Sequence, residues 1–112
     1  MTDTIFGKIA RREIPATIVA ESERCIAFRD VAPQAPVHVL VVPKKAYASL
    51  NDVDDPALLG DLMTLVREVA RKEGLAEDGY RVVINTNRNG GQTVFHLHAH
   101  VLGGRAMSWP PG

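Results

Sequence analysis

Three histidines alternate with two apolar residues in the segment His96-Leu97-His98-Ala99-His100. In a β-strand, successive side chains point to opposite faces of the sheet, so all three imidazoles would share one face. In a helix, the same spacing would scatter the rings over about 200° of arc, with no common target. Alternate side chains on a strand stand roughly 6.5–7 Å apart, close enough to line a compact anion such as a phosphate. The spacing therefore predicts a strand whose imidazole face does chemistry.

The residues alone leave three interpretations of this face open. The first is covalent catalysis at phosphorus, in which one imidazole attacks while its neighbours hold phosphoryl oxygens, assist the leaving group and fix tautomers. The second is a zinc site with an open water position, although no Asp or Glu follows Asp78 to complete the ligand set. The third is a chance grouping of surface histidines on a polar strand face. The pattern favours the first interpretation.

The segment just before the histidines, residues 89–93, also favours an anion. Its Gly-Gly pair lets backbone N–H groups approach an anion closely, and Gln92 and Thr93 add neutral donors. By itself, Asn-Gly-Gly is typical of a tight turn between two strands. The fourth histidine, His38, lies in an apolar segment and needs a polar partner there. An imidazole of the triple is the candidate partner.

Short strands and one long helix must position these side chains. The long helix is expected at residues 56–73, with Asp55 as its N-cap, Pro56 in its first turn and Gly74 after its end. A short helix is expected at residues 5–12 and a turn at residues 87–91. The expected strands are residues 17–20, 24–29, 37–42, 80–85 and 94–102. The expected apolar faces are Phe95, Leu97, Ala99 and Val101 on the last strand, and Leu59, Leu62, Met63, Val66, Val69 and Ala70 on the long helix. This order predicts an α+β fold with an antiparallel sheet.

The whole chain has the composition of one ordinary globular domain. Its 112 residues form a single expected domain, 1–112, with an irregular tail at 103–112. The 13 basic and 13 acidic residues cancel, which argues against nucleic acid or an anionic membrane as partner. Cys25 is the only cysteine, so no disulfide framework or cysteine-based zinc knuckle is expected. Without a secretory signal or a run of membrane-spanning length, the expected location is cytoplasmic.

Residues 91–104 resemble the signature of the histidine triad (HIT) family, His-φ-His-φ-His-φ-φ with φ apolar. More narrowly, they resemble the branch of histidine triad nucleotide-binding proteins. Residues 3–9 resemble the opening of that branch and residues 28–38 its second block. The final Trp-Pro-Pro-Gly, residues 109–112, distinguishes the branch from the dinucleoside-polyphosphate hydrolases. The resemblance therefore covers nearly the whole chain.

The resemblance implies a role for each candidate site residue. His98 would be the nucleophile that takes the nucleotidyl group, and His100 would contact the phosphate and assist the leaving amine. His96 and His38 would form a supporting relay that orients His98. Asp30 would bind the ribose hydroxyls, a role that suits its acceptor-only carboxylate. The remaining nucleotide-binding residues would be Ile5, Phe6, Ile9, Phe28, Arg29 and Val31 around the base, and Asn85, Gly91, Gln92 and Thr93 near the phosphate or leaving group.

The implied activity is that of a purine nucleoside phosphoramidase. Such an enzyme cleaves the P–N bond of an AMP-amine or AMP-lysine type compound through a nucleotidyl-histidine intermediate, and it needs no metal and no cofactor. The implied partners are a purine nucleotide of the AMP or GMP type and a second copy of the chain. In that homodimer two five-stranded antiparallel sheets, each with one long and one short helix, would join into one, with Trp109 near the other subunit's site. The alternatives are a nucleotide-binding regulatory module with low turnover and a zinc-dependent hydrolase.

Three residues depart from the pattern of the branch. Thr93 stands where serine is common, which keeps the hydroxyl but adds a methyl near the leaving group. Phe95 stands where tyrosine is common, and we expect little consequence because its position falls on the core face of the strand. Arg29 stands where histidine is common. It is expected to put a charge near the base slot, so the preference between adenine and guanine stays open.

Overall fold

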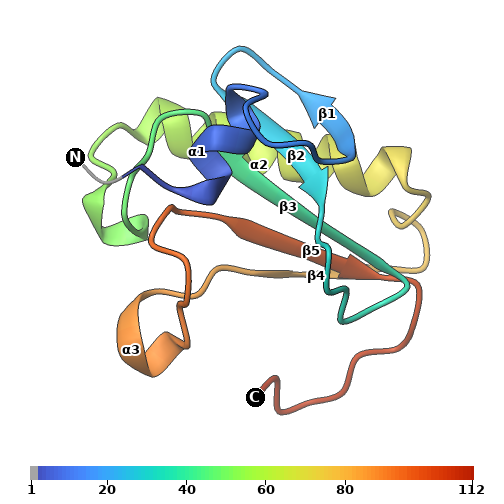
Figure 1. The fold of residues 1–112 in the computed structure, drawn as a ribbon. Helices are drawn as coiled ribbons and strands as arrows, with labels where there is room; N and C mark the ends of the chain where they lie inside the picture. Colours follow the sequence, from blue (N-terminus) through green and yellow to red (C-terminus); the bar gives the residue numbers. More distant parts are fainter. Residues whose placement is uncertain (1–2) are drawn as a thin grey trace.

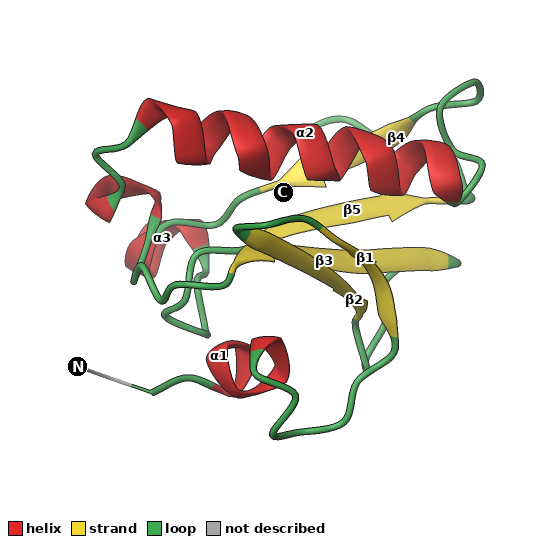
Figure 2. Ribbon diagram, turned by 90° about the horizontal axis from the view of Figure 1, so that it is seen from above, coloured by secondary structure: helices red, strands yellow, loops and turns green. Residues whose placement is uncertain are grey.

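A computed structural model describes residues 3–112 as an antiparallel five-stranded sheet with helices on both of its faces (Figures 1 and 2). Along the sheet the order is β1-β2-β3-β5-β4. The strands are β1 (Ile18–Glu21), β2 (Cys25–Arg29), β3 (Val37–Pro43), β4 (Tyr80–Val83) and β5 (Ala99–Gly103). The predicted α+β class with an antiparallel sheet is confirmed.

The two main helices lie on opposite faces of the sheet (Figure 2). The short helix α1 (Ile5–Ala10) lies on one face, and α2 (Pro56–Lys72) crosses the other. The Asp55 side chain accepts a hydrogen bond from the N–H of Ala57, so the predicted N-cap of α2 is confirmed. Two single turns complete the helical content of the described residues: η1 (Leu50–Asp52) and α3 (Asn87–Gly90), the latter where only a turn was expected.

The buried stripe of α2 is rotated from the expected one. Met63 is 45% exposed, so its predicted burial is wrong, and Leu59 is only partly buried. Successive residues of a helix are about 100° apart, and the buried face runs nearer to Leu58 than to Met63. The buried residues of α2 are Leu58, Leu62, Leu65, Val66, Val69 and Ala70.

Each face of the sheet packs its own hydrophobic core. The register pairs His38 with Leu102 and Leu40 with His100, so these four side chains share one face. Leu40 packs there with residues of α1, such as Phe6. The intervening residues, including Val101, point to the opposite face and pack against α2. The strand alternation therefore places His38 and His100 on the α1 side of the sheet.

The histidine strand is shorter than expected, because β5 begins at Ala99 rather than at residue 94. Its last ladder pair with β3 joins Val41 to Ala99, and β3 ends at Pro43, which has no N–H to extend the ladder. The preceding segment is irregular and is held by isolated bonds, such as the 2.6 Å bond from the Leu97 N–H to the Tyr47 carbonyl.

Other boundaries differ less from the expected ones. Phe95, predicted to face the core, is 51% exposed because it precedes β5 and does not follow the pleat of the strand. Strand β4 ends at Val83 rather than at residue 85, and α1 ends at Ala10 rather than at residue 12. Among residues 3–112, no helix is long and apolar enough to cross a bilayer.

Candidate active site

A pocket of about 330 Å³ opens on the α1 side of the sheet. Apolar side chains from α1, β2, β3 and the loops beside them make up most of its wall, and His98, His100, Asp30 and Thr93 supply polar groups. The pocket brings together ten of the residues expected at a nucleotide site: Ile5, Phe6, Ile9, Phe28, Arg29, Asp30, Val31, Thr93, His98 and His100. It adds five that the sequence analysis did not single out: Ile14, Pro15, Ala16, Leu40 and Val94. An apolar cavity with a few polar groups at one side is typical of a small-molecule site.

His98 presents an unprotonated nitrogen to this pocket. Its Nδ1 lies 2.7 Å from the backbone carbonyl oxygen of His96. A carbonyl can only accept, so Nδ1 carries the proton of the neutral ring and Nε2 keeps its lone pair. The ring is 6% exposed and packs edge-on against Phe6, with ring centroids 5.0 Å apart. This tautomer is the one a nucleophile requires.

His96 is a buried structural ring rather than a pocket residue. Its Nε2 lies 2.7 Å from the carbonyl oxygen of Pro43 and must donate to it. The Nδ1 atom therefore accepts, and its partner is the hydroxyl of Thr4 at 2.6 Å. The ring is 0% exposed, and this burial lowers its pKa because it penalises the charged form. His96 is thus neutral near pH 7, with both nitrogens bonded.

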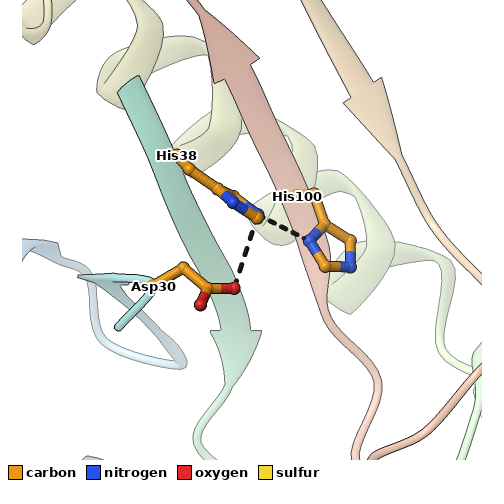
Figure 3. A group of neighbouring side chains, drawn as sticks. All are labelled: Asp30, His38 and His100. Carbon is orange, nitrogen blue, oxygen red and sulfur yellow. Dashed lines mark hydrogen bonds and ion pairs between the residues drawn. The ribbon is translucent and has the colours of Figure 1, made fainter. Parts of the chain in front are cut away.

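His38 and His100 form a second chain of hydrogen bonds beside Asp30 (Figure 3). The N–H of Gln34 donates to His38 Nδ1 at 3.0 Å, so the proton of the neutral His38 ring lies on Nε2. That Nε2–H donates to His100 Nδ1 at 2.9 Å, whereas the Asp30 carboxylate is farther away, at 3.5 Å. His100 therefore carries its own proton on Nε2.

Desolvation keeps this second pair of rings neutral as well. Burial lowers the pKa of His38. Burial, followed by the positive charge that His98 and His38 would carry if protonated, lowers the pKa of His100 to about 4. With neutral rings, these hydrogen bonds leave one imidazole lone pair, on His98, and one imidazole N–H, on His100. This pairing suits attack on an electrophile whose other atoms need a hydrogen-bond donor.

The chain as a whole matches proteins of known family. The HIT domain family matches residues 11–107. This chain belongs to the HIT family. It is 62% identical, over 98% of its length and 97% of the relative's, to an uncharacterized HIT-like protein of Synechococcus elongatus. It is 50% identical to the purine nucleoside phosphoramidase of Escherichia coli, over 94% of this chain and 90% of that protein.

Solved structures agree with this assignment. The HIT family hydrolase of Legionella pneumophila superposes with a TM-score of 0.94 at 52% identity, covering 98% of this chain and all of that one. A histidine triad protein of Clostridium difficile superposes with a TM-score of 0.91 at 43% identity, covering 96% of each chain. The predicted family and fold are thereby confirmed, as is the predicted enzyme class, a hydrolase.

The relay in this HIT site differs from the expected one. The expectation that the His38 ring orients His98 is wrong, because the His38 ring bonds to His100. His96 does orient His98, but through its backbone carbonyl rather than its imidazole. On the irregular segment before β5, the rings of His96 and His98 bond to backbone carbonyls. The expected regular strand did not include these contacts.

The cluster of Asp30, His38 and His100 has the residue types of a metal site, and one ligand atom from each lies within 4.8 Å of the others. Two histidines and a carboxylate are a common ligand set for divalent metals. Here, however, the Gln34 N–H occupies the lone pair of His38 Nδ1, and Nε2 holds the proton that is donated to His100. A protonated nitrogen has no lone pair for a metal. The hydrogen bonds of the cluster therefore fit a proton-fixing chain better than a metal centre.

Besides His38 and His96, four expected site residues do not line the pocket: Asn85, Gly91, Gln92 and Trp109. The Gln92 side chain is buried and bonds to the backbone of Ala48, Asn87 and Val94, which fixes the loop instead. Gly91 has a φ of 78° as the residue that ends α3, a conformation that favours glycine. The part these residues play toward phosphate or leaving group stays a prediction.

Arg29 is among the residues that line the pocket, but its guanidinium is directed toward the end of α2. The guanidinium donates to the carboxylate of Glu73, the residue that ends α2, at 2.6 Å. Arg29 follows Phe28 in β2, so its side chain points to the α2 face. The structure therefore pairs the charge of Arg29 with Glu73, whereas the sequence led us to expect it near the base slot.

Three groups that fix the tautomers were not predicted from the sequence: the Thr4 hydroxyl, the Gln34 N–H and the Pro43 carbonyl. Two of them are backbone groups, which carry no signal in residue type. Thr4 does carry a signal, because it directly precedes an apolar helix start as an N-cap does. That signal predicts a cap and gives no indication of the contact with His96.

Proposed function

We propose that this HIT protein hydrolyses the P–N bond of a purine nucleoside phosphoramidate through a covalent nucleotidyl intermediate on His98. The observation that carries the proposal is the tautomer of His98, whose Nδ1–H is bound by the His96 carbonyl at 2.7 Å. The free Nε2 lone pair belongs to a ring that lines the pocket. The name of the Escherichia coli relative supports the same reaction.

In this proposal the apolar part of the pocket holds the base. Phe6 and Phe28 meet edge to face, with centroids 5.4 Å apart, and offer an aromatic corner for a flat ring. The carboxylate of Asp30 accepts hydrogen bonds from the two ribose hydroxyls. Thr93 and His100 then face the phosphate, so a nucleotide of the AMP or GMP type is the expected ligand.

The reaction proceeds in two displacements. His98 Nε2 attacks phosphorus, the P–N bond breaks, and the amine leaves with a proton from solvent while it accepts a hydrogen bond from His100 Nε2–H. A water molecule then attacks the same phosphorus, the bond to His98 Nε2 breaks, and the nucleoside monophosphate leaves as a proton returns to solvent. An imidazole suits both steps because it is nucleophilic when neutral and is a good leaving group from phosphorus.

The proposed assembly is a homodimer in which two sheets join at β4. Of the two edge strands, β1 has an irregular register between Ile18 and Ala20, which blunts an edge, whereas β4 pairs regularly. The C-terminal tail lies near β4, because Arg81 donates to the carbonyl of Ser108 at 2.9 Å and its guanidinium lies 5.9 Å from the Trp109 ring centroid. Trp109 is 81% exposed and is thus free to meet a second subunit. The cytoplasmic location stays a prediction.

Turnover of adenosine 5′-phosphoramidate tests the proposal, with and without a chelator. We expect release of AMP and ammonia at a rate that chelation does not change. Rapid acid quenching followed by mass spectrometry should find one AMP on a peptide that contains His98. A protein that binds AMP but releases no amine would support the regulatory alternative. Loss of activity on chelation, restored by zinc, would support the metal-dependent one.

A further inference from the structure

The N-terminus of α1 contacts the catalytic segment through the hydroxyl of Thr4. The Thr4 Oγ1 atom accepts a hydrogen bond from the Gly7 N–H at 2.9 Å and lies 2.6 Å from His96 Nδ1. Because His96 Nε2 must donate to Pro43, the hydroxyl donates its proton to Nδ1. Thr4 is 9% exposed and His96 is 0% exposed, so water cannot readily replace either partner.

We infer that Thr4 is a positioning residue, which ties the base-binding helix α1 to the His96 carbonyl that orients the nucleophile His98. The expected effect of Thr4 on kcat rests on the proposed function. The inference goes beyond that function because Thr4 does not line the pocket and touches none of the reacting atoms.

The need for such a tie follows from where β5 begins. Residues 96–98 precede the strand, so no ladder holds the peptide between His96 and Leu97, whose N–H bonds to the Tyr47 carbonyl outside the sheet. The His96 ring adds a bond at each of its nitrogens, to Thr4 on one side and to Pro43 on the other. A ring held at two points restricts the backbone that carries it. The carbonyl of residue 96 is thereby kept 2.7 Å from His98 Nδ1.

The same tie links nucleotide binding to the nucleophile. Ile5 and Phe6 directly follow Thr4, and both line the pocket. The Phe6 ring also meets the rings of His96 and His98, at centroid distances of 6.0 and 5.0 Å. A base seated against this turn therefore presses on the element that holds the His96 ring. Removal of the Thr4 hydroxyl should affect the chemical step more than it affects binding.

Three variants separate this role from a merely structural one. Thr4→Val keeps the shape but removes the hydroxyl, Thr4→Ser restores it, and Arg11→Ala removes the exposed ion pairs from Arg11 to Asp3 and Glu13. We expect Thr4→Val to lower kcat by about tenfold or more, since small misplacements of a reacting group are costly, with KM changed less than kcat. Thr4→Ser should recover most of the rate. Arg11→Ala should loosen the ends of α1 and leave kcat near the wild-type value.

Gly7→Ala provides a second perturbation if Thr4→Val does not fold. A Cβ at this position would stand 3.3 Å from Thr4 Oγ1, while alanine itself favours the helix. We expect kcat to fall without loss of thermal stability. Unchanged kcat in Thr4→Val, or in Gly7→Ala if Thr4→Val does not fold, would overturn the inference. So would a Thr4→Ser variant as slow as Thr4→Val, or an Arg11→Ala variant with an equal loss of kcat.

Nitrogen-15 NMR of the imidazoles in the nucleotide-free protein tests the same point without turnover. The wild type and Thr4→Ser should show one His98 tautomer, protonated at Nδ1, and Thr4→Val should show a mixture. An unchanged His98 spectrum in Thr4→Val would overturn the inference. A wild-type protein that fails to hydrolyse phosphoramidate contradicts the proposed function alone, since this measurement still decides the role of Thr4.

Discussion

The four histidines share one residue type, yet each has a different hydrogen-bond partner and therefore a different chemistry. His96 and His98 are held by backbone carbonyls, and His38 is held by a backbone N–H. These partners decide which nitrogen carries the proton, and only His98 is left with a free lone pair directed at substrate chemistry. These hydrogen bonds thus distinguish the proposed nucleophile from three other side chains of the same residue type.

Substitution of His98 tests its role as nucleophile. His98→Ala should lower turnover of adenosine 5′-phosphoramidate by at least about a thousandfold, because the covalent route is lost. AMP binding, measured by calorimetry, should survive because the base slot is formed by other side chains. His98→Asn is the matched control, since its amide N–H can still reach the His96 carbonyl. A variant of either kind with a near-normal rate would exclude His98 as the nucleophile.

The buried neutral histidines also make stability depend on pH. Burial lowers the pKa of His38, His96 and His100 below the usual 6.5, and that of His100 to about 4. Below pH 6.5 these histidines bind protons in the unfolded chain but much less in the folded protein, so the free energy of unfolding should fall steadily toward pH 4. Above pH 6.5 these groups should add no pH dependence.

Urea unfolding between pH 7.5 and 4.5 measures this loss before most carboxylates titrate. His100→Asn should reduce the slope of the free energy of unfolding against pH in that interval. The variant has one group fewer that binds a proton in the unfolded state but not in the folded state. A stability that stays level down to pH 4.5 would contradict the assignment of neutral rings.

At the residue scale, the sequence predicts which side chains form the site better than it predicts their hydrogen-bond partners. Alternation correctly predicted that the three imidazoles share a face, although two of them precede the strand. The bonds to Pro43 and Gln34 could not be predicted, because backbone groups look alike in every sequence. The charge of Arg29 was misplaced for a related reason: its partner, Glu73, is 44 residues away in the chain.

At the element scale, local signals predicted helices better than strand ends. Asp55 and Pro56 mark the start of α2, and Gly74, with a φ of +74°, marks its end. The start of β5 depends instead on where its neighbour β3 ends, at Pro43. Strand pairing depends on two segments that are far apart in the chain. A prediction from the sequence of one segment alone therefore makes the strand too long.

The end of β5 packs closely against the loop that follows α2, and a substitution at Gly103 can test this packing. A Cβ on Gly103 would lie 2.7 Å from both terminal methyl carbons of Leu75, a side chain that is 5% exposed. Gly103→Ala should therefore cost about 1–3 kcal/mol of stability, as overpacking of a filled core does. Thermal and urea unfolding should both detect it.

A double variant shows whether this contact is the cause. Leu75→Ala alone should destabilise by about 2–5 kcal/mol through the cavity it leaves. If the two side chains compete for one space, Gly103→Ala should cost little in the Leu75→Ala background. Equal costs in both backgrounds would attribute the effect to the backbone of Gly103.

At the scale of the whole molecule, the pocket joins segments from both ends of the chain. Residues 5–16 form one wall, residues 28–31 and 40 a second, and residues 93–100 the polar side. No local pattern predicts that these segments meet, and only the resemblance to the HIT family gave the expectation. The resemblance could not give the tautomers, since they depend on contacts of this particular chain.

The C-terminal tail carries the last prediction, which concerns the proposed dimer. Trp109 is 81% exposed beside β4, and two prolines follow it, so the tail offers a stiff aromatic anchor to a neighbouring surface. The proposal that the sheets join at β4 brings this anchor close to a second subunit. We expect light scattering at micromolar concentration to find a dimer. Truncation after Gly104 should change the preference among amine leaving groups more than the affinity for AMP, because the base slot lies on the α1 side of the sheet. A monomer, or a truncated protein with an unchanged substrate profile, would contradict the prediction that the tail lies near the second subunit's site.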